Sequence, residues 1–69
     1  MPKRTAKELR VYAEENRLLA AHRRAEAALY ENTAREVDAG IDYETDEFLR
    51  LNDAVIEAEN RLPKRFQED

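Results

Sequence analysis

His22 is the single histidine of this 69-residue sequence, and carboxylates lie at helical spacing on both sides of it. Glu15 comes seven residues before His22 and Glu26 four residues after it, so all three share one side of a helix. Imidazole and carboxylate groups together can bind iron, manganese or zinc in a helical bundle. The di-iron bundles use Glu-x-x-His, but Leu19 stands three residues before His22. We expect an ordinary His22–Glu26 pair at i,i+4, with a metal site at Glu15, His22 and Glu26 as an alternative.

Other catalytic chemistry finds little support in the composition. The sequence contains no cysteine and no serine, which excludes a Ser or Cys nucleophile and a disulfide framework. Its one glycine, Gly40, cannot form a Gly-rich phosphate loop. Paired carboxylates need a pocket, and two helices alone do not make one. We therefore expect a protein that is not an enzyme and holds no cofactor.

A long first helix is expected to carry His22 and its neighbours. Thr5-Ala6-Lys7-Glu8 fits a capping box, in which the Thr5 side chain caps the helix and Glu8 reaches back to the Thr5 amide. Neither Gly nor Pro interrupts the chain from there to Asp38. Gly40 suits the left-handed residue that closes a helix. The sequence predicts a helix over about residues 6–38 and a turn over 39–43.

A second, shorter helix is expected over about residues 44–62. Asp42 or Thr45 can cap its start, and Pro63 stops it after Leu62. Residues 63–69 are expected to form a frayed tail. The short turn favours an antiparallel hairpin, so residues 1–69 form a single small helical domain of the all-α class.

Each expected helix carries more than one apolar face. The first has two stripes about 100° apart, Val11, Leu18, Ala25 and Leu29 on one and Tyr12, Leu19, Tyr30 and Val37 on the other. The second has a narrow seam of the coiled-coil type, made of Phe48, Leu51, Val55, Ala58 and Leu62. Leu49 and Ile56 lie on a different face of it. A helix with two apolar faces usually touches more than one neighbour.

The first helix is also too long for its neighbour. At 1.5 Å per residue it extends about 50 Å, against roughly 30 Å for the second helix. Its N-terminal end therefore lacks a partner within the chain, unless the helix kinks near Asn16 and folds over. We expect two hairpins to pair as a dimer into a four-helix bundle. The residues expected at an interface with self or with a protein partner are Leu9, Val11, Tyr12, Leu19, Tyr30, Leu49 and Ile56.

These features predict a non-enzymatic protein–protein interaction module, such as a small adaptor, regulator or inhibitor that acts through helix-face packing. A component of a larger hetero-complex without separate activity is a further reading. No apolar run approaches the ~20 residues of a membrane span, and no signal peptide is visible, so we expect a cytoplasmic protein without a membrane partner.

Charge is unevenly distributed along the chain, whose net charge is −4. Residues 1–24 hold seven Lys or Arg against three Glu, and residues 25–62 hold three Arg against eleven Asp or Glu. A regulator that binds nucleic acid through the basic half is the alternative function. The side chains that would contact a polyanion are Lys3, Arg4, Lys7, Arg10, Arg17 and Arg24.

Overall fold

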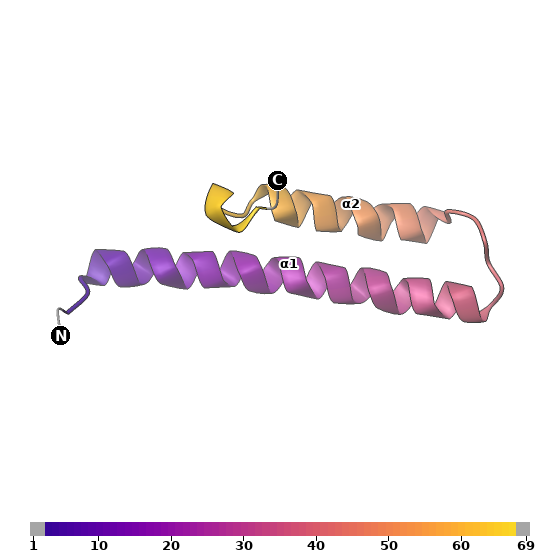
Figure 1. Ribbon diagram of the computed structural model, residues 1–69, viewed down its shortest axis with the longest axis horizontal. Helices are drawn as coiled ribbons and strands as arrows, with labels where there is room; N and C mark the ends of the chain where they lie inside the picture. The colour runs from indigo at the N-terminus through magenta and orange to yellow at the C-terminus, as the bar shows by residue number, and fades with distance from the viewer. Residues whose placement is uncertain (1–2, 68–69) are drawn as a thin grey trace.

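The computed structural model describes residues 3–67 and shows two antiparallel helices joined by a short loop (Figure 1). Helix α1 spans Ala6–Asp38, helix α2 spans Asp46–Asn60, and a 3-10 turn η1 spans Lys64–Phe66. The hairpin is elongated, at 56 × 19 × 17 Å. The expected all-α hairpin with a long first helix is confirmed. Neither helix of the described part is long and apolar enough to cross a membrane.

Helix α1 has the capping interactions that its sequence predicts at both ends. The Thr5 hydroxyl accepts a hydrogen bond from the Glu8 amide, while the Glu8 carboxylate accepts one from the Thr5 amide, each at 3.1 Å. At the other end Gly40 has φ +77°, and the amides of Gly40 and Ile41 donate to the carbonyls of Val37 and Glu36. This pattern is a Schellman motif, which satisfies the last carbonyls of the helix.

Helix α1 is continuous through Asn16, where a kink was the alternative. The Asn16 side-chain amide donates to the Tyr12 carbonyl at 2.7 Å, one turn earlier in the same helix. The backbone therefore stays helical around a side chain of modest helix propensity. Because no break occurs, the N-terminal end of α1 projects past the end of α2, as the indigo end of Figure 1 shows.

Helix α2 is shorter at both ends than the predicted span of 44–62. It begins at Asp46 because Thr45, the second of the two expected caps, accepts a hydrogen bond from the Phe48 amide at 3.0 Å. It ends at Asn60, and the Leu62 amide donates to the Glu59 carbonyl in a tighter turn. Pro63 disfavours the helical conformation in the residue before it, so the helix stops ahead of Leu62.

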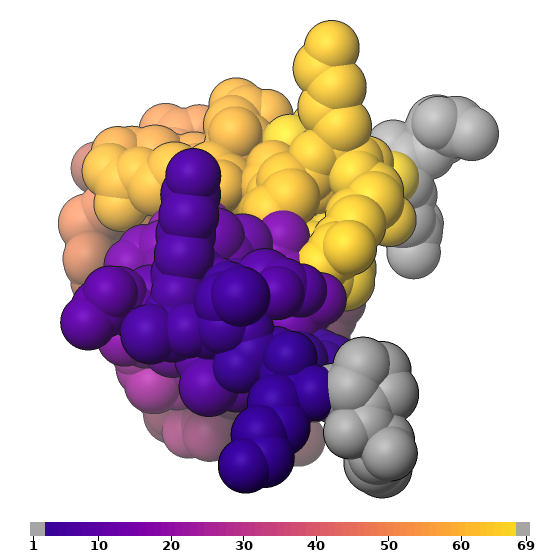
Figure 2. Space-filling view, turned by 90° about the vertical axis from the view of Figure 1, so that its left-hand side faces the viewer, coloured from indigo at the N-terminus to yellow at the C-terminus, as the bar shows by residue number. Residues whose placement is uncertain are grey.

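The segment after Pro63 was predicted to fray, and this prediction is wrong for the part that the structure describes. Residues 64–66 form η1, and the Gln67 side-chain amide donates to the Leu62 carbonyl at 2.6 Å. Arg65 forms an ion pair with Glu15 of α1. Figure 2 looks at this open end of the hairpin, with the indigo start of α1 and the yellow C-terminal segment both facing the viewer. Residues 68 and 69 lie outside the described range.

Candidate interaction surface

The contact between α1 and α2 buries very little. We call this contact the seam. On the α1 side it is lined by half-buried or buried residues that lie three and four positions apart. On the α2 side it is lined by Phe48, Leu51, Val55 and Ala58, and by Leu62 just after the helix. Among residues 3–67 the buried apolar side chains are Leu29 and Leu62, and no side chain is completely buried. A hydrophobic core of this size gives a 69-residue chain little stability.

Polar groups fill part of the seam near the turn. Asn32 is the one buried polar residue of the described chain. Its amide donates to the Glu36 carboxylate at 2.8 Å, and the Thr45 hydroxyl donates to the same oxygen at 2.6 Å. The cluster joins α1 to the cap of α2, which fixes the register of the two helices at the loop.

Large apolar side chains lie outside the seam. Seven of them in the described chain are between 43% and 68% exposed: Leu9, Val11, Tyr30, Val37, Tyr43, Leu49 and Ile56. The structure thus exposes five of the seven residues that the sequence placed at an interface. The other two, Tyr12 and Leu19, are half-buried. Large apolar side chains exposed together in this way are typical of a surface that binds another protein.

Most of these exposed side chains share one side of the hairpin. At 100° per residue, Tyr30 and Val37 lie roughly 90° around α1 from the seam, and Leu49 and Ile56 lie roughly 110° around α2. Because the two helices are right-handed and antiparallel, residues at the same angle from the seam, counted along each chain, lie on the same side of the hairpin. Leu9 and Leu19 follow the same side of α1. We call this side the apolar face, made of Leu9, Leu19, Tyr30, Val37, Leu49 and Ile56.

A depression of about 350 Å³ is lined by residues of both helices and confirms that these positions lie on one side of the hairpin. Arg23 lies beside Leu19 on α1, and Glu59 lies on the corresponding side of α2. Both residues line the same depression, together with Leu62 and Phe66 at its floor. The groove between α1 and α2 therefore opens on the apolar face near the open end of the hairpin.

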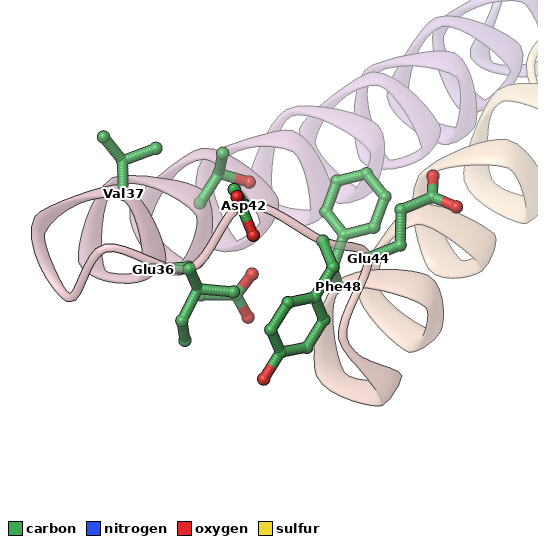
Figure 3. Close-up of a pocket in the computed structure, with 8 residues that line it drawn as sticks. Glu36, Val37, Asp42, Glu44 and Phe48 are labelled. Atoms are coloured by element: carbon green, nitrogen blue, oxygen red, sulfur yellow. The ribbon is translucent and has the colours of Figure 1, made fainter.

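A second depression, of about 220 Å³, opens at the turn. Figure 3 shows its lining: Glu36 and Val37 come from α1, Asp42 and Glu44 from the loop, and Phe48 from the start of α2. Ile41, Tyr43 and Thr33 complete it. Apolar side chains and carboxylates thus stand together here, an arrangement that suits the apolar stem and charged head of a Lys or Arg side chain.

The N-terminal end of α1, residues 6–14, extends beyond α2; we call it the overhang. Its seam side meets the tail at Arg65. Lys7, Val11, Tyr12 and Arg65 line a depression of about 320 Å³ there with Glu8 and Glu15. The Arg4 guanidinium stacks on the Tyr12 ring, 4.6 Å from its centroid. A stacked arginine covers part of an aromatic ring that would otherwise face water.

The structure does not bring Glu15, His22 and Glu26 together as ligands of one metal ion. His22 lies in the seam, with Nδ1 3.5 Å from the Glu26 carboxylate, as an i,i+4 pair. Glu15 is engaged elsewhere, by Arg65. Within residues 3–67, no three His, Cys, Asp or Glu side chains come close enough together to hold an ion.

The basic residues proposed for a polyanion do not form one open surface. Arg10, Arg17 and Arg24 lie seven residues apart along the back of α1, but Arg17 forms an ion pair with Glu14 at 2.7 Å. On α2 the exposed pairs Arg50–Glu47 and Arg61–Glu57 also lie away from the apolar face. Positive and negative side chains therefore alternate along the back of the hairpin. Lys3, Arg4 and Lys7 lie together at the open end of the hairpin.

Sequence reasoning did not identify two contributors to this surface. Asn32 was not singled out, although it follows Leu29 by three residues and precedes Glu36 by four, which places it in the seam. Phe66 lies beyond Pro63, and no local pattern in the sequence marks it as part of this surface.

Comparisons with family models, with curated proteins and with solved structures find no match to this chain. The function is therefore argued from the geometry of the hairpin itself.

Proposed function

We propose that this chain is a non-enzymatic protein–protein interaction module that acts by packing its apolar face against another helical surface. The assembly we propose is a four-helix bundle of two hairpins, in which each helix gains a second neighbour. A module of this kind works as an adaptor, regulator or inhibitor through the surface it occupies.

One observation carries the proposal: within residues 3–67 the seam buries two large apolar side chains, while the apolar face leaves Tyr30, Val37, Leu49 and Ile56 in water. Burying apolar area stabilises a fold by about 25 cal/mol per Å². A hairpin that leaves several large apolar residues exposed gains stability when a partner covers them.

The distribution of charge supports the same face. The intrahelical ion pairs Arg17–Glu14, Arg50–Glu47 and Arg61–Glu57 lie on the back and the opposite side, with side chains about half or more exposed. Exposed pairs of this type contribute about 0–1 kcal/mol each and keep a helix surface hydrated. One side of the hairpin is thus suited to water and the other to a protein.

Two matched variants of α2 test the proposal. Ile56→Glu places a charge on the apolar face, whereas Ala54→Glu places the same side chain on an exposed position two residues away. Size-exclusion chromatography with light scattering should give two chains per particle for the native protein and for Ala54→Glu. Ile56→Glu should elute as a single chain. If both variants keep the native mass, or if the native protein is a single chain throughout, the apolar face is not the contact surface.

A further inference from the structure

The two ends of the hairpin carry opposite charges that no ion pair within the described residues neutralises. Lys3, Arg4, Lys7 and Arg10 stand at and before the overhang, and none of them joins an ion pair within residues 3–67. At the turn the same holds for Asp42, Glu44 and Asp46. The C-terminal segment adds Lys64 to the basic end. Each end therefore has the charge that the other end of a second copy would attract.

The overhang also lacks apolar neighbours that a second copy can supply. Leu9 and Val11 are about half exposed on it. Helix α1 has 33 residues, so its midpoint is His22. If two α1 helices run antiparallel about that midpoint, residues 6–14 of one copy lie beside residues 30–38 of the other. This pairing brings Leu9 and Tyr12 to the part of the apolar face that exposes Tyr30 and Val37.

We propose that the overhang of each copy docks across the apolar face of a second copy, antiparallel to its α1 and next to its acidic turn. The inference rests on the proposed function, because the ends meet only if the apolar faces associate. The docked helix lies along the groove between α1 and α2, with Tyr30 and Val37 on one side of it and Leu49 and Ile56 on the other. The depression at the turn then receives a basic side chain from the region of Lys3 to Lys7.

The competing arrangement has its twofold axis parallel to the helices. It pairs each α1 with the second copy's α2, but it places the two basic overhangs at one end and the two acidic turns at the other. Like charges held together oppose association, whereas the perpendicular axis sets each basic overhang against an acidic turn. The perpendicular axis also gives the overhang a helical neighbour, which the parallel axis does not.

A distance between two copies of one label separates the arrangements. Ala6 is exposed in the first turn of α1, and Ala6→Cys introduces the chain's only thiol. Spin labels at this position, measured by pulsed electron resonance on the full chain, should lie about 48 Å apart or more, twice the rise from residue 6 to residue 22. A separation of about 20 Å, two helix diameters, would overturn the inference.

A charge exchange tests the contact itself. Asp42→Lys with Glu44→Lys should raise the dissociation constant about fivefold at low salt, which corresponds to about 1 kcal/mol lost from exposed charge pairs. Adding Arg4→Glu and Lys7→Glu should recover most of that loss. The control Asp53→Lys with Glu57→Lys changes the net charge equally but lies away from the turn, and it should have a smaller effect. No difference between the turn variant and this control would contradict the docking.

The outcomes keep the two proposals apart. A native dimer with a short label distance and no recovery in the charge exchange leaves the proposed function standing and removes the docked overhang. A native chain that is monomeric by light scattering removes the proposed bundle of two hairpins and the docked overhang with it.

Discussion

The substitution Ile56→Ala distinguishes an apolar face that is open to water from one that is covered. Ile56 is 47% exposed in the hairpin. Burying a whole Ile side chain stabilises a fold by about 1.5–3 kcal/mol, so half-burial contributes roughly 1 kcal/mol. Alanine returns about 0.4 kcal/mol through its higher helix propensity. An isolated hairpin should therefore lose only about 0.5 kcal/mol.

A covered apolar face predicts a much larger loss. Truncating a fully buried Ile to Ala costs about 2–5 kcal/mol, which leaves about 1.6 kcal/mol or more after the gain in helix propensity. We expect this larger value. Leu62→Ala provides the reference for a buried position, because Leu62 is only 5% exposed within one hairpin.

Urea denaturation followed by circular dichroism measures both costs at matched chain concentrations. We expect Ile56→Ala to lower the free energy of unfolding by nearly as much as Leu62→Ala does. It also expects the transition midpoint of the native chain to rise with concentration, because unfolding then separates two chains. A cost near 0.5 kcal/mol for Ile56→Ala, with a midpoint independent of concentration, refutes the reasoning.

Three further substitutions test the elements that hold the hairpin, each by the same denaturation assay. Thr5→Ala removes the cap of α1 and should cost about 1 kcal/mol, with Thr33→Ala as a mid-helix comparison. Gly40→Ala should also cost about 1 kcal/mol through the backbone alone, because φ is +77° and an added Cβ meets nothing within 4 Å. Asn32→Ala should cost about 1–3 kcal/mol, since it removes a buried donor to Glu36. The control Asn52→Ala should change stability little, because the Asn52 side chain makes no hydrogen bond within the described chain.

Local signals in the sequence predicted the helix ends where a side chain or glycine acts on its own neighbours. The capping box of Thr5 and Glu8 and the closing role of Gly40 depend on residues within one turn, so spacing alone reveals them. The start of α2 was left between Asp42 and Thr45, since both are competent caps. Thr45 prevails in a structure where its hydroxyl also reaches Glu36 of α1, a contact nine residues distant in sequence.

Tertiary contacts account for what the sequence did not reveal. The tail returns to the hairpin because Arg65 meets Glu15, fifty residues away, and no local pattern encodes that pairing. The two stripes of α1 were recognised, but the full position of the seam was not, because it follows the first stripe through Leu29 and also includes His22 and Asn32. Apolar periodicity could not find this position, because polar residues occupy part of it and are satisfied by partners on the same helix or at the cap of α2.

The candidate surface was partly predictable for the same reason. Tyr30, Leu49 and Ile56 were placed at an interface from their angular position, and they are exposed in the hairpin. Val37 and Tyr43 are equally exposed but were not included among the expected interface residues. Val37 shares the angular position of Tyr30 on α1, whereas Tyr43 lies in the loop, where helical periodicity does not apply.

Sedimentation equilibrium of the native chain over a wide concentration range, with helix content followed by circular dichroism, tests the central claim most directly. The account predicts a particle of two chains at high concentration and a loss of helix as dilution separates them, because one hairpin buries too little to stay folded. A single chain that keeps its full helix content at every concentration would contradict the claim that a second copy covers the apolar face.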